Sequence, residues 1–138
     1  MIAKLLKSQR GEGLISALYT MFILFIVFFV GIDIAGYTGT SWKLRNACSE
    51  TLALMKIENG YDSNIEQKFI GYLSQLKLDP ARVAVTATPQ KVQRGDIVTI
   101  RAITPYVITS LRPFNQELSF DVTVELSGMA QDFIQEGN

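Results

Sequence analysis

Residues 13–32 read GLISALYTMFILFIVFFVGI and contain no charged side chain. A helix of these 20 residues matches the length needed to cross the roughly 30 Å hydrocarbon core of a bilayer. Asp33 is the first charge that follows. Only a large protein could surround such a helix on all sides, and this chain has 138 residues. The sequence therefore predicts a single membrane-spanning helix.

The charges before this segment predict its orientation. Lys4, Lys7 and Arg10 precede the segment, and Glu12 is the one acidic residue among them. The positive-inside rule then places the N-terminus in the cytoplasm and the rest of the chain outside the cytoplasmic membrane. A cleavable secretory signal is the alternative, but its apolar core is about 7–15 residues long and ends at an A-x-A-like site. Residues 34–36, Ile-Ala-Gly, match that site poorly.

The composition argues against several function classes. The 13 basic and 13 acidic residues cancel, and no basic cluster indicates a nucleic-acid partner. The chain has no histidine, which removes the commonest general base and metal ligand. We find no nucleophile constellation, phosphate loop or metal spacing. We therefore expect no enzymatic activity, cofactor, metal or small-molecule substrate.

The helical pattern continues beyond the apolar segment. Apolar residues recur at spacings of three and four, at Ile34, Tyr37, Leu44, Ala47, Cys48, Leu52 and Met55. Gly36 and Gly39 weaken the helix propensity and allow a bend there. Asn59-Gly60 then predicts a helix end after Glu58, because both residues tolerate the left-handed conformation.

A second, short helix follows. Ser63 and Glu66 have the spacing of a capping box. The apolar residues of its predicted buried face are Ile65, Phe69, Tyr72, Leu73 and Leu76. We expect this amphipathic helix to end before Asp79-Pro80.

The remaining chain alternates with a period of two. Strands are predicted over 83–88, stopped by Pro89, and over 97–104, stopped by Pro105, with a turn at 93–96 between them. The third strand alternates most clearly, with Leu118, Phe120, Val122, Val124 and Leu126 on one face. The predicted fold is α+β: a long N-terminal helix, a short amphipathic helix and a three-stranded antiparallel meander packed on the long helix.

Several single residues have two possible roles each. Asp33 is expected to be an interfacial charge rather than a functional acid inside the membrane. Trp42 and Tyr37 either anchor the chain at the membrane interface or pack on the domain. Asp121 and Glu125 share one strand face, which is more typical of a solvated surface than of a catalytic pair.

Cys48 is the single cysteine, so an internal disulfide is excluded. It falls on the apolar side of the predicted helix, where a free cysteine behaves as a small hydrophobic residue. A reactive or lipidated thiol is the less favoured alternative.

The segment 10–15, Arg-Gly-Glu-Gly-Leu-Ile, joins a short basic leader to the apolar helix. This layout resembles a type IV prepilin or pseudopilin. It is most similar to the small pilin-like proteins of tight-adherence (Tad) loci in Firmicutes, relatives of the TadE-like minor pilins. The resemblance divides the chain into a leader at 1–11, a transmembrane and extracytoplasmic helix at 12–58, and a small extracytoplasmic domain at 61–138.

The resemblance implies a processing site and an assembly site. A prepilin peptidase would cut after Gly11, and Glu12 would become the new N-terminus of a helix that packs inside a filament. Such subunits usually carry an acid at the fifth position after the cut, where it pairs with a neighbour's terminal amine. Ser16 occupies that position here. It can offer a hydrogen bond but no ion pair, which fits a minor or initiating subunit.

The implied partners are other pilin-like subunits, a prepilin peptidase and an inner-membrane assembly platform. The alternative hypothesis is an uncleaved, signal-anchored accessory protein that binds a partner through its extracytoplasmic domain.

Overall fold

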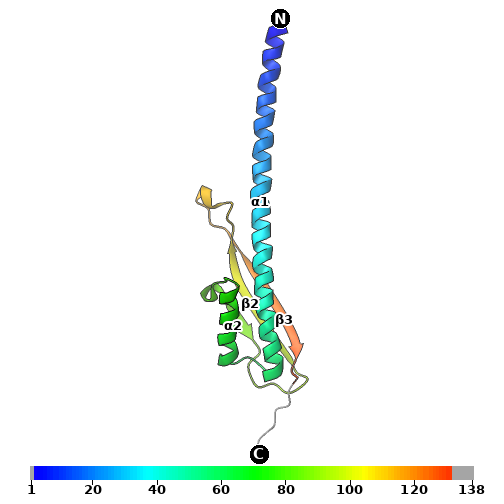
Figure 1. The fold of residues 1–138 in the computed structure, drawn as a ribbon, viewed down its shortest axis with the longest axis vertical. Helices are drawn as coiled ribbons and strands as arrows, with labels where there is room; N and C mark the ends of the chain where they lie inside the picture. The colour runs from blue at the N-terminus through cyan, green and yellow to red at the C-terminus, as the bar shows by residue number, and fades with distance from the viewer. Residues whose placement is uncertain (1, 132–138) are drawn as a thin grey trace, which may run out of the picture.

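The computed structural model describes the backbone of residues 2–131 and the side chains of residues 11–131. Its main elements, in chain order, are α1 (Ile2–Glu58), α2 (Ser63–Gln75), β1 (Ala84–Ala87), β2 (Ile97–Val107) and β3 (Ser119–Met129). Figure 1 shows α1 running along most of the molecule, with α2 and the sheet beside its C-terminal half. The predicted α+β fold is confirmed. The last part of the predicted domain 61–138, residues 132–138, lies outside the described residues.

The long helix α1 is continuous. It begins at Ile2, inside the predicted leader, and passes Gly11 without a break. Gly36 and Gly39, where the sequence allows a bend, are both helical, and the helix is not interrupted there. The N-terminal half of α1 is exposed and its C-terminal half packs in the domain, yet the helix is continuous through both halves.

The predicted end of α1 is confirmed. The backbone leaves the helix at Asn59, with φ of 55°, and at Gly60, with φ of 134°. The Gly60 N–H donates to the Met55 carbonyl at 3.0 Å, which satisfies one of the unpaired carbonyls of the last turn.

The predicted capping box of α2 is wrong. The N-cap is Asp62, whose carboxylate accepts from the Ile65 N–H at 2.8 Å, while Ser63 is the first residue of the helix. Both residue types are strong N-caps, and Asp62 has the extended backbone that the cap position needs. The predicted buried face is confirmed for Ile65, Phe69 and Leu73.

The sheet is a three-stranded meander of order β1-β2-β3, as predicted. β1 pairs antiparallel with β2, with Thr86 opposite Arg101. β2 pairs antiparallel with β3, with Ala102 opposite Val124. The second strand of the meander lies in the middle, so both of its edges are used.

The prediction that Pro105 stops the second strand is wrong. Thr99 turns its backbone toward β1: its N–H donates to Thr88 Oγ1 at 3.0 Å and its carbonyl accepts from the Thr88 N–H at 2.9 Å. Pro105 turns its nitrogen to the same side, because backbone direction repeats every second residue. β1 pairs no further along β2 than Ala84 opposite Ile103. The N–H that Pro105 lacks is therefore not needed by the ladder.

The core lies between the C-terminal half of α1, α2 and one face of the sheet. Its buried apolar residues are Leu44, Ala47, Cys48, Leu52, Met55, Ile65, Phe69, Leu73, Val98, Ile100, Ala102, Val122, Val124 and Ala130. These residues come from every layer, so the domain cannot form without the second half of α1.

The third strand is buried over only part of its predicted apolar face. Val122 and Val124 are buried, and Leu126 is half-buried. Leu118 and Phe120 are 47% and 54% exposed, because this end of the sheet extends past the core along α1. They lie at the end of the domain that is nearest to the apolar half of α1.

Candidate membrane and assembly helix

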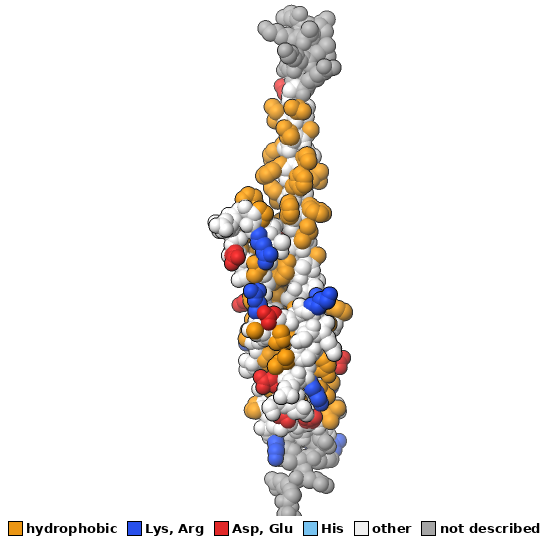
Figure 2. All heavy atoms as spheres, turned by 60° about the vertical axis from the view of Figure 1, so that its left-hand side comes forward, with side chains coloured by type: hydrophobic (Ala, Val, Ile, Leu, Met, Phe, Trp, Pro, Cys, Tyr) orange, Lys and Arg blue, Asp and Glu red, His pale blue; other side chains and the backbone are white. Residues whose placement is uncertain are grey.

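The N-terminal half of α1 presents apolar side chains on all sides. Every large apolar side chain from Leu14 to Ile32 is at least 42% exposed. Figure 2 shows apolar side chains gathered around the upper part of the molecule, above most of the domain. α1 is long and apolar enough to form a single membrane span, and no other helix in the described part of the chain is. The predicted membrane-spanning element is confirmed to this extent.

Gly11, Glu12 and Ser16 all lie on the exposed surface of α1. A side chain added at Gly11 would meet no atom within 4 Å. Glu12 and Ser16 are four residues apart and therefore share one face of the helix. The Ser16 carbonyl also accepts from the Thr20 hydroxyl at 2.9 Å. The side chains of this segment are therefore accessible to a protein that binds it.

Asp33 joins the C-terminal end of the apolar segment to the domain. Its carboxylate accepts from the backbone N–H groups of Thr109 and Ser110, at 2.8 Å and 3.2 Å, and from the Tyr106 hydroxyl at 3.5 Å. The side-chain hydrogen bond of Ser110 is the largest influence on its pKa. Desolvation opposes it, but the hydrogen bonds together hold the pKa of Asp33 below its ordinary value. We call these four residues the Asp33 clamp.

Aromatic contacts next to the Asp33 clamp bring α1 and the sheet together. The rings of Tyr37 and Tyr106 meet edge to face, with centroids 6.1 Å apart. The Tyr37 hydroxyl donates to the Asp121 carbonyl at 3.4 Å. A Cβ atom at Gly36 would overlap the Tyr106 phenol, so the ring needs a glycine at this point of the helix. The domain is thus attached directly where the apolar segment ends.

A cavity of about 620 Å³ lies between α1 and the loop that the Asp33 clamp holds. Its walls are mainly apolar and include Val30, Ile34, Leu111 and Phe120. The cavity is open to the surface beside the apolar segment. It would suit an apolar group far better than a charged one.

The side chains of Trp42, Asp121 and Glu125 all lie on the surface. Trp42 is 63% exposed, so the structure does not bury it against the domain. Asp121 and Glu125 have exposed side chains, on the face that is opposite to Val122 and Val124. Among the described residues, no three His, Cys, Asp or Glu side chains gather where they could hold a metal ion.

Cys48 is fully buried, and burial raises the pKa of its thiol to about 12. The thiolate form is therefore strongly disfavoured. The interpretation of Cys48 as a small hydrophobic core residue is confirmed.

Sequence reasoning missed the Asp33 clamp. Asp33 and Thr109 are 76 residues apart, and the bonds to Thr109 and Ser110 use backbone N–H groups that every non-proline residue has. No residue type marks such acceptor sites in advance. An acid directly after an apolar span was the one available signal, and it is equally typical of an interfacial charge.

These features define a class of protein: a small α+β domain carried on a long helix whose N-terminal half is apolar. Residues 21–134 match the family model described as Domain of unknown function (DUF4320). The match covers most of the chain, so the protein belongs to the DUF4320 family. It includes the second half of the apolar segment, the Asp33 clamp and the whole sheet. No curated protein and no solved structure shows a significant match to the chain.

Proposed function

We propose that the protein is a pilin-like structural subunit, a minor pilin or pseudopilin of a Tad or type IV-like pilus or secretion machine, with no enzymatic role. α1 holds it in the cytoplasmic membrane with the N-terminus in the cytoplasm. The domain lies on the extracytoplasmic side. The observation that supports this most is the apolar segment, because within the described part of the chain its large apolar side chains all remain at least 42% exposed.

An uncovered apolar helix of bilayer length has two stable surroundings, lipid and other helices of the same kind. Helix association in membranes depends on close packing rather than on the hydrophobic effect, so a subunit can exchange lipid for neighbours at low cost. Repeating one such contact with a rotation that does not close produces a filament. The continuous α1 would keep each domain at a fixed position relative to its packed helix.

Ser16 favours a minor or initiating position over a major filament subunit. A hydroxyl can form a hydrogen bond with a neighbour's terminal amine, whereas an acid would form an ion pair, and charge-assisted bonds are about twice as strong. The partners in this proposal are other pilin-like subunits, a prepilin peptidase and an inner-membrane assembly platform.

The test is the intact mass of the protein with and without a prepilin peptidase. We expect the wild-type chain to lose residues 1–11 only when the peptidase is present. Gly11→Leu should leave the protein inserted but uncut and excluded from filaments. Gly13→Leu is the matched control, since a side chain at either glycine meets no atom within 4 Å.

An intact Met1 in both samples, or normal filament incorporation of Gly11→Leu, would contradict processing at Gly11. The protein would then be an uncleaved, signal-anchored accessory protein that binds a partner through its domain. The neutral Ser16 is the observation that favours this second function, because a permanently anchored helix has no need of an ion pair with a neighbour.

A further inference from the structure

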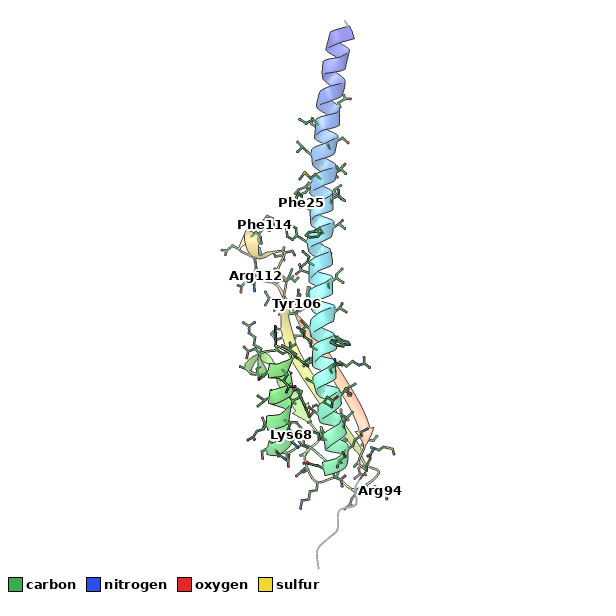
Figure 3. The ribbon with its side chains drawn as sticks, viewed as in Figure 1. Phe25, Lys68, Arg94, Tyr106, Arg112 and Phe114 are labelled. Carbon is green, nitrogen blue, oxygen red and sulfur yellow. The ribbon has the colours of Figure 1, made fainter. Side chains whose placement is uncertain are left out.

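The connection between β2 and β3, residues 108–118, extends toward the N-terminal half of α1. The Asp33 clamp holds its first residues, Thr109 and Ser110, at the end of the apolar segment. The rest of the connection, with the short helical turn Arg112–Phe114, extends further in the same direction. Figure 3 shows Phe114 beside the apolar half of α1, at a height between Phe25 and Tyr106.

The tip of this connection has the chemistry of a membrane-interface contact. Phe114 is 74% exposed, and Leu118 is 47% exposed. Arg112 is an exposed cation two residues from Phe114. An apolar ring next to a long cationic side chain suits the boundary between acyl chains and headgroups, where each finds its preferred surroundings.

We propose that this connection is a second membrane contact, in which Phe114 inserts at the acyl boundary of the outer leaflet and Arg112 binds a lipid phosphate. The inference rests on the proposed membrane span. With Asp33 at the edge of the span, anything that extends past Asp33 toward Phe25 reaches headgroup depth or below. The domain is then held to the membrane at two points, α1 and the connection, which fixes its tilt.

Lipid fits this surface better than a second copy of the chain. Arg112 needs a negative charge beside an apolar surface, and residues 13–32 of a neighbouring copy carry none. Asp33, the first acid after that segment, already accepts from Thr109 and Ser110. An anionic phospholipid supplies the apolar chains and the charge together.

The test uses tryptophan fluorescence of the full chain in vesicles. Trp42 is the single tryptophan, so Trp42→Phe gives a silent background for Phe114→Trp. The vesicles contain phosphatidylglycerol and phosphatidylcholine with brominated acyl chains, which quench only a nearby indole. Phe25→Trp reports on the span itself, and Ile97→Trp, at the opposite end of β2, reports on the water-exposed domain. All three sites are exposed in the structure, so none of the changes disturbs the core.

We expect quenching of the probes at 25 and 114 and none of the probe at 97. Quenching at 25 without quenching at 114 would overturn this inference and leave the span intact. No quenching at either position would overturn the span, and the inference with it. A blue shift at 114 that needs high protein density and ignores the brominated chains would identify a neighbouring copy as the occupant, which also overturns the inference.

The charge is tested separately by Arg112→Glu, with Lys68→Glu as the matched control on the exposed face of α2. Arg112→Glu removes one basic residue, which by itself should lower the ratio of inserted to free tip by about fivefold, and the added acid should lower it further, seen as greater access of acrylamide to the indole at 114. Lys68→Glu should leave that access unchanged. Equal access in both variants would overturn the assignment of Arg112 to a lipid phosphate.

Discussion

The two halves of α1 share one backbone conformation and have opposite surroundings. From Leu14 to Ile32 the large apolar side chains are exposed on every side of the helix. From Leu44 to Met55 a stripe of apolar side chains recurs at spacings of three and four and is buried: Leu44, Ala47, Cys48, Leu52 and Met55. The N-terminal half of α1 is thus exposed on all sides, and its C-terminal half contributes one apolar stripe to the core. Local conformation alone therefore does not tell which half needs a partner.

The largest expected difference between the halves is in the free energy of unfolding of the domain. Leu44→Ala should lower it by about 2–5 kcal/mol, because Leu44 is fully buried and its loss leaves a cavity. Leu24→Ala, in the exposed half, should change it by less than about 0.5 kcal/mol. Denaturant unfolding followed by near-UV circular dichroism measures both. Equal effects would show that Leu24 is packed against other atoms rather than exposed.

Two glycines test where the domain begins to contact α1. A methyl group at Gly36 would overlap the Tyr106 phenol, whereas one at Gly31 would meet no atom within 4 Å. Gly36→Ala should therefore destabilise the domain by about 1–3 kcal/mol through overpacking. Gly31→Ala should be neutral or stabilise the helix by up to about 1 kcal/mol. The same unfolding measurement separates them, and a neutral Gly36→Ala would contradict the close approach of Tyr106.

The smallest effect is expected at the boundary between the halves, in the Asp33 clamp. The pKa of Asp33 is lowered in the folded protein, so its contribution to stability is present above the unfolded pKa of about 4 and is lost as the pH falls through the folded value. The amide resonances of Thr109 and Ser110 should therefore shift together in acid. In Asp33→Asn they should not titrate. A titration that persists in Asp33→Asn would assign it to another carboxylate.

The secondary structure could be predicted largely from local pattern. The apolar run, the Asn59-Gly60 stop and the alternation in the strands each follow from the physics of a few neighbouring residues. The errors also have local causes. Asp62 and Ser63 are both good caps, and only the backbone conformation selects Asp62. The sequence predicts a strand end at Pro105 because it does not tell which edge of the strand lacks a partner.

The candidate site also contains residues that the sequence predicts and residues that only the fold brings together. Gly11, Glu12 and Ser16 follow from a resemblance in sequence, and the structure shows them on the exposed surface of α1. The Asp33 clamp and the tip around Phe114 appear only once the chain is folded. They depend on contacts between residues about 76 positions apart, which no window of sequence contains.

The sequence by itself determined that this protein has one helix able to cross a membrane and a small α+β domain behind it. It could do so because hydrophobic length and period are properties of consecutive residues. The tertiary structure alone decided that the β2–β3 connection returns to the end of the apolar segment and is held there by Asp33. The physical reason is the sheet register together with the packing of Tyr106 against Gly36. These two features fix where the β2–β3 connection meets α1.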